Sequence, residues 1–140
     1  MGLYERLLGS WQLVSSAWHD DAGGAESPFA QDEIGQLNYD ASGRMSAQLG
    51  RRHQPHFAAD DFRLATAEEK STAWGGYFAY FGTYVVDEEA GVVIHRVEGS
   101  TFPNIVGTEQ RRRCTLAGNR LTLAADTPWG HVTIVWEKTG

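Results

Sequence analysis

His95 is the ionisable side chain best placed to do chemistry in this sequence. It lies in a predicted strand over residues 92–99, on a face with two valines, while Arg96 and Glu98 occupy the opposite face. Because side chains alternate along a strand, His95 is expected to point into the protein. An imidazole there could act as a general acid or base near neutral pH, with Tyr84 as the second catalytic group. The alternative is a core histidine hydrogen-bonded to a tyrosine or to the backbone.

A second group of side chains could contact a ligand inside the protein. Tyrosine hydroxyls can orient a ligand while their rings supply apolar contact area, although the same rings also serve as plain core residues. An amide such as that of Gln110 could act as a polar anchor in an apolar pocket. The predicted ligand-binding residues are Tyr39, Met45, Trp74, Tyr80, Tyr84, His95 and Gln110.

Arg112 raises a separate question. The predicted strand 106–116 alternates, with charged residues on one face, and Arg112 falls on the mostly apolar face together with Gln110. A charge that points into a protein needs a partner, because burial without one is costly. Arg112 is therefore expected to contact another interior side chain.

Several kinds of chemistry have no support in the sequence. His53 and His56 lack the spacing of a known metal site, so no metal is predicted. No phosphate-binding loop, dinucleotide fingerprint or nucleophile elbow is present, so no cofactor is predicted. Cys114 is the only cysteine, which excludes an intrachain disulfide, and it is expected to be a buried, inert thiol.

The charge and length of the chain restrict its partners. The 140 residues carry a net charge of −6, which argues against nucleic-acid binding because that requires a basic face. The sequence has neither a signal-like start nor an apolar run long enough to cross a membrane, so a cytoplasmic protein is expected. A small apolar molecule is the expected partner, and a homodimer is left open.

Alternation and turn residues predict about eight short strands in one domain, residues 1–140. The predicted strands are 9–14, 34–39, 45–49, 77–86, 92–99, 106–116, a strand around 121–123, and 131–137. A short helix is expected near residues 3–8. A second helix over 67–74 begins at a capping box formed by Thr66 and Glu69. Strands joined in hairpin order predict an all-β fold, an eight-stranded up-and-down antiparallel barrel that can hold one small ligand.

The two helices are expected to close the barrel. The N-terminal helix would seal one end, and the helix 67–74 would cover the mouth as a lid, with Gly75 and Gly76 as its hinge. The alternative is a helix that simply plugs the mouth. Both arrangements give the same packing.

A Gly-Ser-Trp sequence at residues 9–11 is similar to the start of the first lipocalin strand. The chain as a whole resembles the bacterial and fungal lipocalin-like domain family, in order and over essentially its full length. The matching segments are 9–14, 35–39, 43–49, 79–87, 94–98, 102–104 and 106–108, followed by residue 112, 121–123 and 136–137. The resemblance implies a lipocalin-like barrel in which Trp11 and Arg112 are structural, stacked as a cation–π pair of about 1–2 kcal/mol.

Three functions follow from this interpretation. The first is binding of a small, largely apolar molecule in the central cavity. The alternative is a cofactor-free cyclase or isomerase that acts on a polyketide- or terpenoid-like biosynthetic intermediate, with His95 and a tyrosine transferring a proton. The third is an oligomeric interaction module whose barrel has a filled core.

Overall fold

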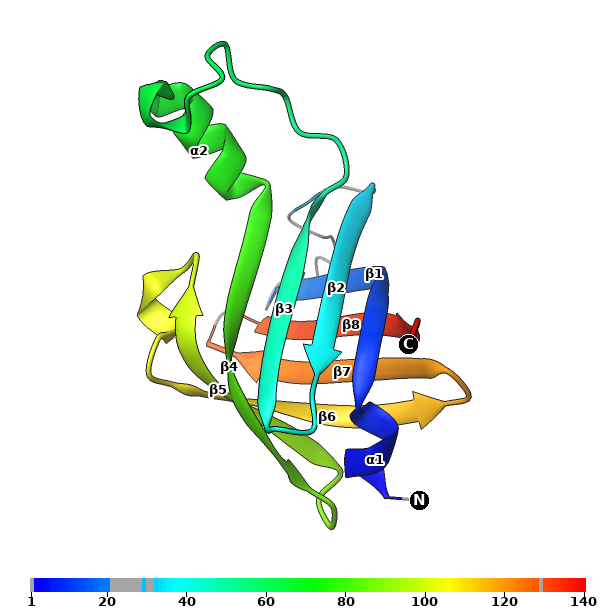
Figure 1. Cartoon of the computed structure of the whole chain (residues 1–140). Helices are drawn as coiled ribbons and strands as arrows, with labels where there is room; N and C mark the ends of the chain where they lie inside the picture. Colours follow the sequence, from blue (N-terminus) through cyan, green and yellow to red (C-terminus); the bar gives the residue numbers. More distant parts are fainter. Residues whose placement is uncertain (1, 21–28, 30–31, 129) are drawn as a thin grey trace.

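A computed structural model describes residues 2–20, 29, 32–128 and 130–140. The chain forms a closed barrel of eight antiparallel strands in sequence order, with β8 pairing back to β1 (Figure 1). The strands are β1 Gly9–Asp20, β2 Glu33–Tyr39, β3 Arg44–Arg51, β4 Tyr77–Asp87, β5 Val92–Ser100, β6 Glu109–Ala117, β7 Arg120–Thr127 and β8 Gly130–Lys138. Closure pairs every strand on both sides, so the sheet has no exposed edge. The predicted up-and-down barrel is confirmed.

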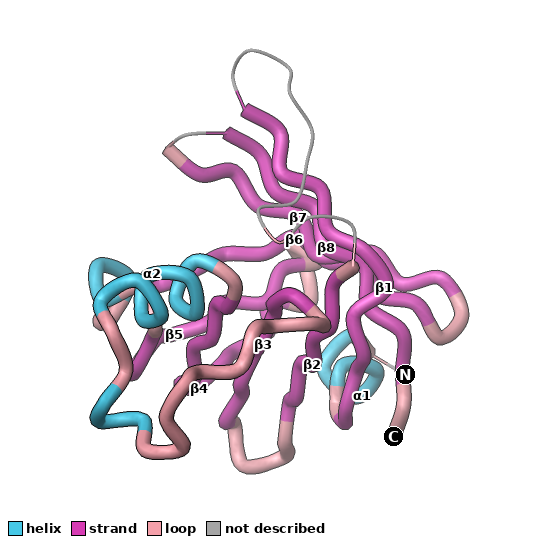
Figure 2. The backbone as a smooth tube through the Cα atoms, turned by 90° about the horizontal axis from the view of Figure 1, so that it is seen from above, coloured by secondary structure: helices cyan, strands magenta, loops and turns pink. Residues whose placement is uncertain are grey.

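Two α-helices accompany the barrel, α1 Leu3–Leu7 and α2 Ala67–Gly75, together with the short 3-10 turns Phe62–Leu64 and Pro103–Ile105. The predicted capping box opens α2: Glu69 N–H donates to Thr66 Oγ1 at 3.1 Å, and Thr66 N–H donates to Glu69 Oε1 at 2.9 Å. Figures 1 and 2 show α2 and the segment before it extending beyond the ends of β3 and β4. No described helix has the length and apolar character needed to cross a membrane.

β1 and β6 begin or end well away from their predicted bounds. β1 continues past residue 14 to Asp20, because it pairs with β8 along this length after a register shift between Leu13 and Ser15. β6 begins at Glu109 rather than at residue 106. Gly107, with φ of 84°, turns the backbone just before it, in a conformation that favours glycine.

The closed end of the barrel is built around Trp11. Its ring is only 2% exposed, and its Nε1–H donates to the carbonyl oxygen of Leu7 at 2.9 Å. The cation over the ring is Lys138, whose Nζ lies 4.7 Å from the ring centroid, so the predicted stacking of Arg112 on Trp11 is wrong. The β1–β8 register pairs Trp11 with Lys138, whereas Arg112 lies opposite Val93 and lines the barrel interior.

A carboxylate from a distant turn holds the start of α1. The N–H groups of Leu3 and Tyr4 donate to Glu88, in the β4–β5 turn, at 2.7 and 2.9 Å. These bonds satisfy two helix-end donors and place negative charge at the positive end of the helix. Glu88→Ala is therefore expected to lower the free energy of unfolding by about 1 kcal/mol in urea titrations. Glu89→Ala, in the same turn, is the matched control, and equal losses would contradict a capping role for Glu88.

Candidate functional site

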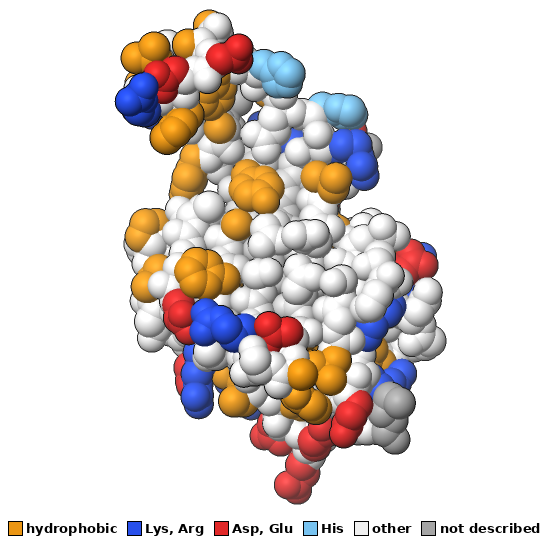
Figure 3. Space-filling model, in the orientation of Figure 1, with side chains coloured by type: hydrophobic (Ala, Val, Ile, Leu, Met, Phe, Trp, Pro, Cys, Tyr) orange, Lys and Arg blue, Asp and Glu red, His pale blue; other side chains and the backbone are white. Residues whose placement is uncertain are grey.

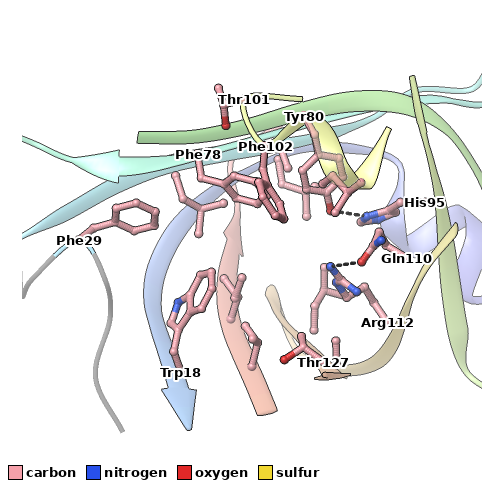
Figure 4. Close-up of a pocket in the computed structure, with 18 of the residues that line it drawn as sticks. Trp18, Phe29, Phe78, Tyr80, His95, Thr101, Phe102, Gln110, Arg112 and Thr127 are labelled. Atoms are coloured by element: carbon pink, nitrogen blue, oxygen red, sulfur yellow. Dashed lines mark hydrogen bonds between the residues drawn. The ribbon is translucent and has the colours of Figure 1, made fainter. Parts of the chain in front are cut away.

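The barrel encloses a cavity of about 690 Å³. This volume lies in the range typical of small-molecule sites. Its wall is mostly apolar and aromatic, and includes Trp18, Phe29, Leu49, Phe78, Leu123 and Ile134 (Figure 4). Trp74 of α2 and Phe102 after β5 also line it, so it extends to the α2 end of the barrel. A cavity of this size is incompatible with the filled-core interaction module.

The main polar groups of the cavity come from three neighbouring strands. Tyr80 lies on β4, His95 on β5, and Gln110 and Arg112 on β6, and all four line the cavity (Figure 4). The β5–β6 register places His95 directly opposite Gln110. The side chains on one face of paired strands are neighbours, so this register gathers the polar groups into one patch.

His95 is at the centre of a buried hydrogen-bonded chain. Its ring is 1% exposed, with Tyr39 Oη 2.6 Å from Nε2 and Tyr80 Oη 2.6 Å from Nδ1. Burial, helped by the positive charge of Arg112, lowers the pKa of His95 to about 3. The imidazole is therefore neutral at physiological pH, with one nitrogen donating a hydrogen bond and the other accepting one.

The two tyrosines of this chain are also neutral. Burial raises the pKa of Tyr39 well above its ordinary value. Burial also raises the pKa of Tyr80, although the nearby Arg112 guanidinium opposes the shift. A charged phenolate would be poorly solvated at this depth. At neutral pH the chain thus consists of uncharged donors and acceptors beside one guanidinium.

The predicted ligand-binding residues divide into two groups. Trp74, Tyr80, His95 and Gln110 line the cavity. Tyr39, Met45 and Tyr84 are buried but are not among the residues that line it. Tyr39 still reaches the site indirectly, through its hydrogen bond to His95.

Tyr84, predicted as the second catalytic group if the protein is an enzyme, hydrogen-bonds elsewhere than to His95. The Tyr84 hydroxyl donates to the carbonyl oxygen of Asp40 at 2.7 Å, in the β2–β3 turn, and its ring stacks on Tyr4. Although Tyr84 is opposite His95 in the β4–β5 register, its side chain reaches toward the α1 end. The tyrosines that contact the imidazole are Tyr39 and Tyr80 instead.

Sequence reasoning missed several cavity residues. Trp18 was outside the predicted first strand because the register shift in β1 interrupts the alternation. Phe29 is 4% exposed and packs edge-on against Trp18, but no periodic pattern surrounds it. Arg112 was correctly placed on the inward face, but it was assigned to the closed end rather than to the cavity. Among the described residues, no group of three His, Cys, Asp or Glu side chains could hold a metal.

A closed eight-stranded barrel around one apolar cavity defines a lipocalin-type barrel. Residues 8–139 match the model of the lipocalin-like domain family, and the chain belongs to that family. It is similar to the "4'-hydroxy-3'-methoxypropiophenone carrier protein ppsC" of Aspergillus oryzae, with 37% identity over 90 residues, 60% of this chain and 81% of the relative. A solved lipocalin-like protein from Bacteroides uniformis shares the fold, with a TM-score of 0.50, 15% identity, and coverage of 96% of this chain and 99% of the other.

Proposed function

We propose that this protein binds and carries a small, largely apolar molecule in its barrel cavity. The observation that supports this most directly is the cavity of about 690 Å³, whose wall is apolar except for one polar patch. Burial of apolar surface supplies affinity, and a few polar groups fix the orientation. The ligand in the name of the Aspergillus oryzae relative, a hydroxy- and methoxy-substituted propiophenone, is an aromatic molecule with few oxygen atoms. A ligand of that class suits this cavity.

A titration with N-phenyl-1-naphthylamine tests the proposal. This neutral apolar dye fluoresces when it leaves water, so a carrier should give saturable one-to-one binding. Native mass spectrometry after exposure to cell extract then identifies the natural ligand as a discrete added mass. Absence of both saturable dye binding and an added mass would contradict the proposal.

Filling the cavity should abolish this binding. Ala125 of β7 is 3% exposed and lines the cavity, so an indole at this position would occupy ligand space. Ala125→Trp is expected to weaken dye binding at least tenfold, about 1.4 kcal/mol. Ala117→Trp, at the exposed end of β6, is the matched control and should leave affinity unchanged. Full affinity in a folded Ala125→Trp variant would place the dye outside the cavity.

A second candidate function is a cofactor-free cyclase or isomerase. One observation favours it: the hydrogen-bonded chain of Tyr39, His95 and Tyr80 reaches the cavity wall, and such a chain can relay a proton. Tyr80 takes the position that the sequence assigned to Tyr84. The low pKa of His95 makes it a weak base, which favours the carrier function. Unchanged affinity with lost turnover in His95→Ala would support catalysis.

The remaining expectations concern partners and location. We infer that the small molecule is the main partner, because the net charge of −6 disfavours nucleic acid. A cytoplasmic location and a homodimer stay predictions. Light scattering of the purified chain decides the oligomeric state.

A further inference from the structure

We propose that the polar patch of the cavity selects ligands that carry an anionic oxygen, held by the Arg112 guanidinium and the Tyr80 hydroxyl. Suitable groups are a carboxylate, a sulfonate or an ionised acidic hydroxyl on an otherwise apolar molecule. This inference rests on the proposed carrier function and specifies the chemistry of its ligand.

Arg112 has no counter-ion among the described residues. Its guanidinium donates to the carbonyl oxygen of Arg111 at 3.1 Å, to Gln110 Oε1 at 3.5 Å and to the Tyr80 hydroxyl oxygen, which uses only part of its N–H donors. None of the ion pairs among the described residues includes Arg112. The side chain is half-buried on the cavity wall, near Gln110 and His95 (Figure 4). Within the described part of the chain, a positive charge therefore faces the ligand space without an anionic partner.

The hydrogen bonds of Tyr39 and His95 determine where the hydroxyl proton of Tyr80 points. Tyr39 is fully buried, and His95 is the one hydrogen-bond partner of its hydroxyl within the described chain. An unsatisfied buried O–H would cost about 1–3 kcal/mol, so Tyr39 donates to Nε2 of the neutral imidazole. The proton of His95 then lies on Nδ1, which donates to Tyr80 Oη. The O–H of Tyr80 is left available, and Tyr80 lines the cavity.

The polar patch of the cavity offers a ligand hydrogen-bond donors rather than acceptors. The Gln110 amide is already engaged, since its Nε2 donates to Thr108 Oγ1 at 2.7 Å while its oxygen accepts from Arg112. The donors that remain in this patch are the Arg112 guanidinium and the Tyr80 hydroxyl. An oxygen that only accepts hydrogen bonds complements this set.

The energetic consequence is discrimination by charge. A neutral apolar ligand that covers Arg112 removes water from the guanidinium and returns nothing, which is costly for an unpaired charge. An anionic oxygen replaces that water with charge-assisted hydrogen bonds, which are stronger than neutral ones. Arg112 should therefore strengthen the binding of anionic ligands, and its removal should not weaken the binding of neutral ligands.

Two dyes with one skeleton test this inference. 8-Anilino-1-naphthalenesulfonate differs from N-phenyl-1-naphthylamine by its sulfonate group. Arg112→Gln is expected to weaken binding of the sulfonate dye at least tenfold and not to weaken binding of the neutral dye. Tyr80→Phe should weaken binding of the sulfonate dye severalfold. Arg111→Gln, which removes the same charge from the exposed face of the same strand, should leave both affinities unchanged.

The outcomes separate the two proposals. Retained binding of the neutral dye by Arg112→Gln also shows that the variant is folded. If Arg112→Gln loses affinity for both dyes equally, or for neither, the proposed selection of anionic oxygen is wrong. The proposed carrier function is not contradicted by either result. If Arg111→Gln weakens binding of the sulfonate dye as much as Arg112→Gln does, the selection by Arg112 is also wrong. The loss of affinity would then come from the net charge of the protein and not from a contact with the ligand. If the wild-type chain binds neither dye, the carrier function itself fails.

Discussion

Trp11→Ala is expected to lower the free energy of unfolding by about 3–5 kcal/mol, as for other buried aromatic residues cut to alanine. The substitution removes a ring that is 2% exposed at the closed end of the barrel. It also removes the hydrogen bond to the Leu7 carbonyl and the ring under the Lys138 ammonium. Leu7 is fully buried in the same core cluster as Trp11, so α1 loses part of its packing against the barrel at the same time. Urea unfolding followed by circular dichroism measures the loss.

Trp74→Ala is the control for this prediction. Trp74 is 58% exposed on α2, and its Nε1–H donates to the Thr101 carbonyl at 2.8 Å. Because most of the ring stays in water, its removal should cost no more than about 1 kcal/mol. Figure 3 shows hydrophobic side chains gathered over the upper part of the molecule, around α2. Equal losses at the two tryptophans would contradict the larger contribution assigned to the Trp11 end of the barrel.

The barrel could be predicted because the patterns that specify its strands and turns each lie within a short stretch of the sequence. Alternation along residues 92–99 and 106–116 identifies which side chains face inward, and Thr66 with Glu69 marks the start of α2. Strands joined by short turns in sequence order leave few arrangements other than a closed meander. The lipocalin-like family and the eight-stranded barrel are both confirmed by the comparisons and by the topology.

The site could be predicted only in part, because a period of two gives the face of a residue and not its depth in the barrel. Arg112 and Trp11 both face inward, yet the register places them at different depths, and Lys138 takes the position over the indole. The same limit explains Tyr84, which shares a register position with His95 but bonds to Asp40. Depth depends on the stagger of all eight strands, which includes the register shifts in β1 and between β4 and β5.

Acidification from pH 7 to pH 5 is expected to lower the free energy of unfolding by about 2 kcal/mol through His95 alone. The pKa of His95 falls from the ordinary 6.5 to about 3 in the folded chain, because burial and the Arg112 charge oppose protonation. At a pH between these two pKa values, His95 binds a proton in the unfolded chain but not in the folded chain. The stabilisation is therefore fully present above pH 6.5 and is lost as the pH falls toward 3. Urea titrations at pH 7 and pH 5 measure it.

Two histidine variants isolate this contribution. His95→Gln keeps a donor and an acceptor between the two tyrosines but cannot titrate, so its stability should change with pH by about 2 kcal/mol less than that of wild type. His56→Gln replaces an exposed histidine that takes part in none of the ion pairs among the described residues, and it should keep the wild-type pH dependence. Carboxylates that also titrate, such as Asp40 and Asp126, are the same in all three chains, so their effect cancels in the comparison. If His95→Gln loses as much stability on acidification as wild type, the imidazole takes up its proton in the folded barrel. Its Nδ1 and Nε2 would then both donate to the tyrosines, and the assignment of a free Tyr80 proton would need to be revised.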